Sequence, residues 1–196
     1  CGALGESGQP NGLGTDSGGR GVVTDVASNT HFDDFELDAA ALGLPGTGRI
    51  RKDALRGGRQ EGVDRIIVDT GQLQIVILPT RGMNVYEVRC GDMRLGWQSP
   101  SAEIVHPRHV DLAHRGGLGW LLGFNECMVR CGLEFAGHPG TDVIVDNVGN
   151  ESTMELTLHG RIAHIPASRV EILIDRAPPH RLHVLGVVHE SHFYGP

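Results

Sequence analysis

The chain has 196 residues, enough for one domain with a substantial core, and its 29 glycines, few aromatic residues and many short apolar runs indicate a turn-rich β protein. Its formal net charge is −7 with histidine neutral, which argues against an electrostatic nucleic-acid binder. No apolar run approaches the ~18 residues of a membrane-spanning helix, and the first residues lack the basic and apolar regions of a signal peptide.

The first 61 residues predict little regular structure. Residues 1–20 contain seven glycines and few apolar side chains, which is typical of a flexible lead-in. Residues 31–44 are acidic and then alanine-rich, and they predict a short helix that ends at a glycine-proline break. The chain stays charged and glycine-rich up to Arg65, which predicts a loop. We therefore expect a flexible and irregular segment over 1–61 and a folded domain over 62–196.

Apolar runs in the rest of the sequence predict antiparallel hairpins. The turn signal Asp69-Thr70-Gly71 separates the first two strands, and Pro79 ends the second because proline cannot donate to the strand ladder. There is no heptad, no fixed-period repeat and no alternation of strands with helices. An antiparallel all-β domain is therefore expected. The predicted strands cover residues 66–68, 73–78, 85–89, 93–97, 143–145, 153–158, 169–174 and 182–188.

The strand over 153–158 ends abruptly in His159-Gly160-Arg161. Glycine permits a sharp turn or the close approach of a ligand, while imidazole offers a neutral donor and acceptor and guanidinium a fixed fork of donors. This combination suits a polyhydroxylated or anionic small molecule. The alternative is a strand that ends in a turn with two solvated polar residues.

Residues 98–140 predict a long irregular segment, and such segments in compact domains are usually functional or mobile. Trp120 and Phe124 stand four residues apart, so they either share a helical face in the core or offer a platform for a sugar ring. Glu126 is a carboxylate in an apolar stretch, and its structural interpretation is a salt-bridged residue. Arg81, at a strand end, either donates to a ligand oxygen or pairs with a surface carboxylate.

The four cysteines, Cys1, Cys90, Cys127 and Cys131, do not form a disulfide framework in a chain of this length, so a reducing cytoplasm is the simplest location. Cys127 and Cys131 with His138 are a weak candidate for a metal site, because the C-x3-C spacing has no second cysteine pair. Structural thiols are the favoured interpretation, and we expect no bound metal.

Six motifs occur in order along the chain: LPTRGMN at 78–84, WQSP at 97–100, GWL at 119–121, FNE at 124–126, RCGL at 130–133 and LHGRIAHIPA at 158–167. Together they resemble the uncharacterised DUF4432 branch of the aldose 1-epimerase-like (galactose mutarotase-like) proteins. The resemblance covers about residues 62–196. It implies a β-supersandwich fold, carbohydrate binding in a cleft on one concave sheet, and interconversion of sugar anomers or a related epimerisation without metal or organic cofactor.

The resemblance also implies site residues. His159, in Leu-His-Gly, looks like the first sugar-contacting histidine of the superfamily. Arg161 looks like the arginine of a His-Gly-x-x-Arg motif, although it stands only two residues after His159. The acid and base of the superfamily lie well downstream of this motif, so we expect a domain that is incomplete at its C-terminus, with the catalytic pair beyond Pro196. The expected substrate-binding residues are His159, Arg161, Arg81, Glu126, Trp120, Asn125 and His106.

Two functions stay open at this point. The first is a sugar isomerase that is active in the full-length protein, and the second is a noncatalytic carbohydrate-recognition protein that uses the same cleft. His189 and Glu190 do not replace the missing pair, because neighbours on a strand point to opposite faces. A metal-dependent hydrolase is disfavoured, since no His-x-His or His-Glu-x-x-His spacing occurs. The expected partner is a small-molecule sugar or sugar derivative, not a nucleic acid or a membrane.

Overall fold

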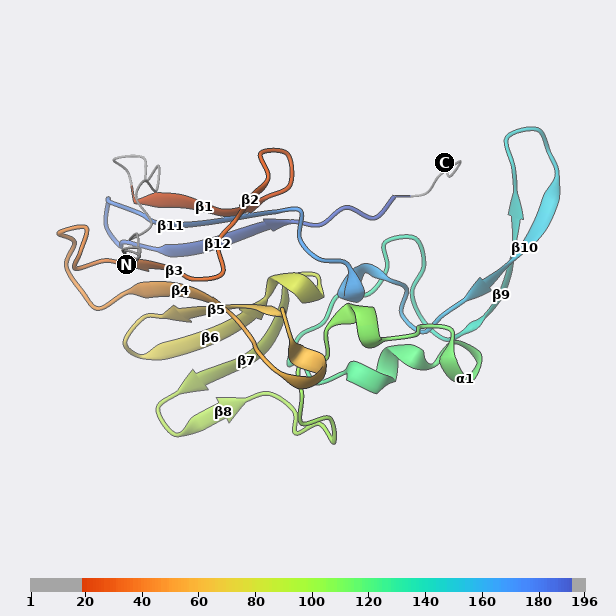
Figure 1. The fold of residues 1–196 in the computed structure, drawn as a ribbon, viewed down its shortest axis with the longest axis horizontal. Helices are drawn as coiled ribbons and strands as arrows, with labels where there is room; N and C mark the ends of the chain where they lie inside the picture. The colour runs from red at the N-terminus through yellow and green to blue at the C-terminus, as the bar shows by residue number, and fades with distance from the viewer. Residues whose placement is uncertain (1–18, 192–196) are drawn as a thin grey trace, which may run out of the picture.

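A computed structural model describes residues 19–191 (Figure 1). Two antiparallel sheets face each other, and a separate hairpin projects beside a region of short helices. The strands are β1 (Arg20–Asp25), β2 (Thr30–His31), β3 (Phe35–Asp38), β4 (Arg49–Ala54), β5 (Asp64–Asp69), β6 (Leu73–Leu78), β7 (Asn84–Cys90), β8 (Met93–Leu95), β9 (Gly140–Val145), β10 (Glu151–Leu156), β11 (Arg169–Ile174) and β12 (Leu182–Val187). The helices are η1 (Gly58–Gln60), η2 (Pro79–Arg81), η3 (Pro107–His109), α1 (His114–Gly117), η4 (Gly119–Gly123) and η5 (Ile162–His164).

The larger sheet has the order β3-β4-β5-β6-β7-β8, so each strand pairs with its neighbour in sequence. The second sheet has the order β12-β11-β1-β2, in which β1 pairs with β11 from the far end of the chain. Every one of these pairings is antiparallel. None of the helices in residues 19–191 has the length and apolar character needed to cross a bilayer.

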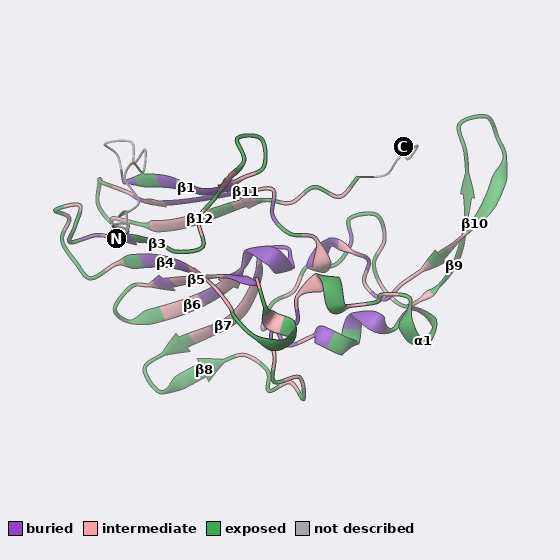
Figure 2. Ribbon diagram, in the orientation of Figure 1, coloured by how far each residue is buried: buried purple, intermediate pink, exposed green. Residues whose placement is uncertain are grey.

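The core lies between the two sheets, because each sheet turns one apolar face inward (Figure 2). Buried and partly exposed residues alternate along β5, which places Ile66 and Val68 on the inner face. The opposing sheet contributes Val170 and Ile172 of β11, both fully buried. The period-2 pattern of the sequence is thus the direct cause of the layered core.

The hairpins expected from the sequence are confirmed. Residues 66–68 and 73–78 lie in β5 and β6, and 85–89 lies in β7, while the strand expected over 93–97 ends earlier, at Leu95. The pair over 143–145 and 153–158 is the β9–β10 hairpin. It projects from the body and every residue of β9 is exposed (Figures 1 and 2). Residues 169–174 form β11, and the strand expected over 182–188 is β12.

The expectations for residues 31–65 were wrong for 31–44 and 49–54, whereas residues 55–63 form a loop that holds only η1. Instead of a helix over 31–44, the chain forms β3, in which Phe35 and Leu37 are buried on the inner face. The carboxylate of Asp38 then accepts backbone hydrogen bonds from Ala40 and Ala41, and this turn competes with helix formation. The expected loop contains β4, whose Lys52 is fully buried.

The predicted boundary after residue 61 lies between β4 and β5, which pair along six residues each in the same sheet. The ammonium of Lys52 donates to Asp64 Oδ1 (2.7 Å) and to the carbonyl of Phe32 (2.6 Å), so the two sides of the boundary also share a buried ion pair. The described part of 1–61 therefore contains four strands, β1 to β4, and is not irregular throughout. The expected flexible lead-in over 1–20 lies almost entirely outside the described residues.

The irregular segment expected over 98–140 is confirmed as the stretch between β8 and β9. It holds only the short helices η3, α1 and η4. A small apolar cluster of Trp120, Leu158 and Ala163 attaches it to the chain that follows β10. This segment and η5 together form the region in which the candidate site residues gather.

Candidate functional site

A buried ion pair stands at the centre of the region. Arg81, in η2, is 1% exposed, and its Nε donates to Oε1 of Glu126, which is equally buried. Its Nη1 donates to the carbonyl of Val105 (2.6 Å) and its Nη2 to that of Gly123 (3.2 Å). Asn84 Nδ2 also donates to Glu126 Oε1, at 3.2 Å. The pair therefore ties the β6–β7 corner to the irregular segment.

The carboxylate of Glu126 is held in its ionised form. Burial by itself raises the pKa of this group, but the charge and hydrogen bonds of Arg81, the backbone N–H of Asn125 and the amide of Asn84 outweigh burial, so the pKa lies below its usual value. Neither sequence interpretation of Arg81 describes this arrangement, since its partner is a buried carboxylate and not a surface one. For Glu126, the structural interpretation as a salt-bridged residue matches the geometry seen.

Close backbone packing brings His164 beside this pair. Gly82 follows η2 with a φ of 63°, and a Cβ on it would lie 2.3 Å from the carbonyl oxygen of Ile162. Only glycine fits such a position without a shift of the backbone. Helices η2 and η5 therefore pack directly against each other, and His164, the last residue of η5, comes within electrostatic range of Arg81 and Glu126.

An aromatic cluster adjoins the ion pair. The indole ring of Trp120 lies 4.6 Å from the ring of Phe124, 4.9 Å from that of His159 and 6.4 Å from that of His164, measured between centroids. Both histidines present an edge-on arrangement to the indole. We call Trp120, His159 and His164 the His–Trp cluster. Since Trp120 is 4% exposed, it packs in the interior rather than forming an open platform.

The His–Trp cluster contains unmet hydrogen-bonding groups. Within residues 19–191, the indole Nε1 of Trp120 and both ring nitrogens of His164 are buried and have no hydrogen-bond partner. Most buried polar atoms in proteins have a hydrogen-bond partner. A buried atom without one therefore indicates a place where a ligand or a bound water can supply the missing hydrogen bond. Three such atoms in one small cluster make it the best candidate for a polar ligand.

His164 is neutral at pH 7. Burial lowers its pKa to about 4, the charge of Arg81 adds to this effect, and Glu126 opposes it in part. A neutral imidazole can accept a hydrogen bond or a proton as well as donate one. The imidazole of His164 can therefore act as a hydrogen-bond partner and as a proton acceptor.

The low pKa of His164 predicts a loss of stability in mild acid. The unfolded chain takes up a proton on this imidazole near pH 6.5, whereas the folded chain does so only near pH 4, so the free energy of unfolding falls as the pH falls between these values. From pH 6.5 to 5 the fall from this group is about 2 kcal/mol. Urea unfolding at several pH values measures it, and a His164→Gln variant with the same slope would contradict it.

The His159-Gly160-Arg161 turn is strained and close-packed. His159 has a φ of 59° and Gly160 a φ of 74°. A Cβ on Gly160 would lie 2.5 Å from the carbonyl oxygen of Phe135, so the glycine serves the close approach of the protein's own loop. Positive φ is uncommon outside glycine, but histidine adopts it more often than most residues, and His180, which lines a pocket elsewhere in the molecule, does so too, so this backbone alone does not mark a site.

Arg161 is engaged in ion pairs. Its Nε donates to Glu190 Oε1 at 3.2 Å and its Nη2 to Glu134 Oε2 at 3.3 Å. It lines a pocket of about 440 Å³ together with Thr157 and Phe135. The expectation that His189 and Glu190 do not form an acid–base pair stays a prediction, but Glu190 has a defined partner in Arg161.

Two more of the expected residues lie at the margin of the ion pair. Asn125 is 2% exposed, and its Nδ2 donates to the carbonyl of Glu103 at 2.9 Å. His106 precedes η3 and its Nδ1 accepts from the backbone N–H of Arg108 at 3.1 Å. Burial lowers the pKa of His106, with smaller contributions from neighbouring cations that include Arg81. The structure thus gathers Arg81, Glu126, Asn125, Trp120 and His159 in one region.

His164 is the residue that sequence reasoning missed. It stands in the same LHGRIAHIPA stretch as His159, five positions later, but the motif by itself assigns it no role. A second histidine within one turn-rich motif was the available signal. Its burial beside Trp120, within electrostatic range of Arg81, is evident only from the structure.

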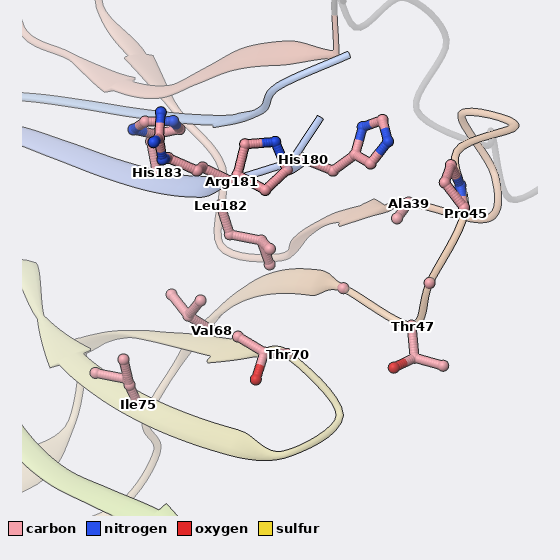
Figure 3. A pocket seen from close by; sticks show the side chains of 13 residues that line it. Ala39, Pro45, Thr47, Val68, Thr70, Ile75, His180, Arg181, Leu182 and His183 are labelled. Carbon is pink, nitrogen blue, oxygen red and sulfur yellow. The ribbon is translucent and has the colours of Figure 1, made fainter. Parts of the chain in front are cut away.

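A pocket of about 540 Å³ lies at the opposite end of the sandwich (Figure 3). It opens between the loop around Thr47 and the start of β12, with Val68 and Leu182 on its walls. His183 at its rim is paired with Asp175, Nε2 to Oδ2 at 3.0 Å. Its lining is largely apolar and holds no buried polar atom without a partner in the described chain, so it is a weaker candidate site.

No metal site forms around the cysteines of residues 19–191. Within the described range, Cys90, Cys127 and Cys131 are free thiols, and Cys1 lies outside it. No group of three or more His, Cys, Asp or Glu side chains among residues 19–191 is arranged to hold a metal ion, and the trio of Cys127, Cys131 and His138 is not such a group.

The fold defines the class of protein. The two-sheet antiparallel architecture is that of the aldose 1-epimerase-like proteins, since it matches a crystal structure of a putative aldose 1-epimerase from Klebsiella pneumoniae subsp. pneumoniae MGH 78578 with a TM-score of 0.79 and 35% sequence identity. The match covers 89% of this chain and 44% of that one, so the chain spans less than half of the length of its relative.

The family of the chain follows from a match to a family model. The family model described as "Domain of unknown function (DUF4432)" matches residues 60–196, and the chain belongs to this family. A search of curated proteins gives no match. The resemblance drawn from the six motifs is therefore confirmed for both family and fold.

Proposed function

We propose that the protein binds a sugar or sugar derivative at the His–Trp cluster and interconverts its anomers, or carries out a related epimerisation, by acid–base chemistry. The observation that carries the proposal is the set of unpaired buried nitrogens on Trp120 and His164. The relative with 35% identity, a putative aldose 1-epimerase, supports the choice of sugar as the ligand. Hydroxyl groups both donate and accept, so they satisfy an indole N–H and an imidazole at once.

The chemistry requires two proton transfers and no cofactor. A base takes the proton from the anomeric hydroxyl, the bond between the anomeric carbon and the ring oxygen breaks, and an acid protonates that oxygen. The open-chain aldehyde then rotates about the bond between C1 and C2. Attack of the same hydroxyl on the opposite face of the carbonyl closes the ring as the other anomer. The imidazole of His164 is neutral at pH 7 and can accept this proton, but its pKa of about 4 makes it a weak base, so its contribution lies toward the lower end of the about 10²–10⁴-fold that a positioned proton transfer gives.

A noncatalytic carbohydrate-recognition protein is the second candidate. The observation in its favour is that Glu126, the buried carboxylate beside the cluster, is already committed to Arg81 and is held ionised by it. It is therefore a poor proton donor or acceptor at neutral pH. In this case His159 and Arg161 contribute hydrogen bonds and no chemistry.

Proton NMR of freshly dissolved α-sugars tests the proposal and separates the two candidates. Acceleration of anomer equilibration by the protein supports the isomerase, whereas saturable line broadening without acceleration supports recognition alone. Absence of both for all sugars tested would remove the proposal. Chelators should leave the result unchanged, because neither candidate uses a metal.

His159→Ala should weaken sugar binding about tenfold while the melting temperature stays close to that of the wild type. The side chain is only partly buried and its ring contact with Trp120 is edge-on, so removal leaves the core intact. His180→Ala, at the remote pocket, is the matched control and should bind sugar normally. A large loss of melting temperature in His159→Ala would mark His159 as structural instead.

A further inference from the structure

A third pocket lies beyond Phe124, on the side of the irregular segment that faces β7 and β8. It has a volume of about 370 Å³, in the range of small-molecule sites, and is lined by Tyr86, Arg94, Trp97 and Asn125 among others. None of its lining residues belongs to the His–Trp cluster. Its chemistry can therefore be considered separately.

The apolar part of this pocket is the indole ring of Trp97, which is supported on its other side by Phe124. Trp97 stacks on Phe124 with ring centroids 5.2 Å apart and an interplanar angle of 24°, and it stays 40% exposed. Phe124 in turn packs on the buried Trp120. A rigid, partly exposed indole offers a flat face to the C–H side of a sugar ring.

The polar part contains an unmet hydrogen bond. Asn125 lines the pocket, and its Oδ1 is buried and accepts no hydrogen bond within residues 19–191. The Nδ2 of the same amide is fixed by its bond to Glu103, so the amide has a defined orientation. Ser99 Oγ donates to the carbonyl of Phe124 at 2.7 Å and accepts from the N–H of Ser101 at 3.0 Å, which fixes the wall beside it. A ligand hydroxyl would supply the missing donor.

The third feature is an excess positive charge. Arg94 and Arg89 both donate to Glu87, through Nε at 2.6 Å and 2.8 Å, so two guanidinium groups share one carboxylate. Arg94 lies against Gly96, where a Cβ would be 3.2 Å from its Cζ. Its two Nη groups make no hydrogen bond with residues of the described chain, so they can donate to an oxygen in the pocket.

We infer that this pocket binds one monosaccharide-sized polyhydroxylated ring, with its C–H face on Trp97, a hydroxyl donating to Asn125 and an oxygen substituent accepting from Arg94. The inference rests on the proposed function only for the choice of sugars as probes. A carboxylate on the ring is favoured over a hydroxyl at Arg94, because a charge-assisted hydrogen bond is the stronger one.

The test is an NMR titration of the protein with galactose, glucose and galacturonate, with affinity read from the backbone amide resonances of the residues that line the pocket. Trp97→Ala should weaken binding about tenfold through loss of the aromatic face, and Trp97→Phe should retain most of the affinity. Leu95→Ala is the matched control, since Leu95 is 63% exposed on the same segment and does not line the pocket. Arg94→Gln should remove the preference for galacturonate.

The outcomes separate this inference from the proposed function. If His159→Ala loses sugar binding and Trp97→Ala does not, the His–Trp cluster is the only sugar site of the two and the inference is wrong. The reverse result supports the inference and removes the proposed site. Equal loss in both variants supports both sites. Failure of all three sugars to bind, or wild-type binding by Trp97→Ala, would overturn the inference.

Discussion

Replacing Arg81 by methionine should lower the free energy of unfolding by about 3–5 kcal/mol. The side chains of Arg81 and Glu126 are 1% and 0% exposed, so the substitution leaves a buried carboxylate without its counter-charge. It also removes the bonds from Arg81 to the carbonyls of Val105 and Gly123. Urea unfolding at pH 7, followed by circular dichroism, measures the change.

Two further variants make this result interpretable. Arg65→Met breaks the two hydrogen bonds between Arg65 and Asp53, whose side chains are 32% and 19% exposed, and it should cost only about 1 kcal/mol because water screens the pair. The double variant Arg81→Met/Glu126→Leu should recover part of the loss, since no isolated charge remains. An equal and small effect of Arg81→Met and Arg65→Met would show that the Arg81 pair does not hold the irregular segment.

His164→Phe should reduce sugar binding at least about tenfold and any acceleration of anomer exchange by about 10²-fold or more. It should not destabilise the fold at pH 7 and is expected to raise the melting temperature slightly. The reason is that His164 buries two ring nitrogens without partners in the described chain, and an apolar ring avoids that cost. A gain of stability with a loss of function is typical of a residue kept for its chemistry.

Measuring both sugar binding and the melting temperature of His164→Phe distinguishes a functional role of His164 from a structural one. Normal sugar binding by His164→Phe would remove it from the site and leave its unpaired nitrogens without a functional explanation. A sharp fall in melting temperature would show instead that His164 has a structural partner. His183→Phe is the control, because the imidazole of His183 is paired with Asp175 at the remote pocket.

The antiparallel β character, the main hairpins from β5 to β12 and the family can all be predicted from local sequence patterns. These features depend on residues that are close together in the sequence. They are the period-2 alternation of strands, the turn residues between strands and the short motifs. Strands β3 and β4 of the larger sheet were not predicted, because β3 is only four residues long and the inward position of Lys52 in β4 depends on Asp64 of the next strand. Lysine is rarely buried unless it is paired, so a short segment that contains a lysine predicts a loop when the buried partner cannot be seen in the sequence.

The candidate site was decided by the tertiary structure. Most of its residues were named from the sequence, but their relations were not, since Arg81 meets Glu126 45 positions away and Trp120 meets His159 and His164 across the β9–β10 hairpin. Burial then sets the chemistry: it commits Glu126 to an ion pair and keeps His164 neutral. Pairing and desolvation depend on which groups share one low-dielectric interior, and no local pattern of residues specifies that.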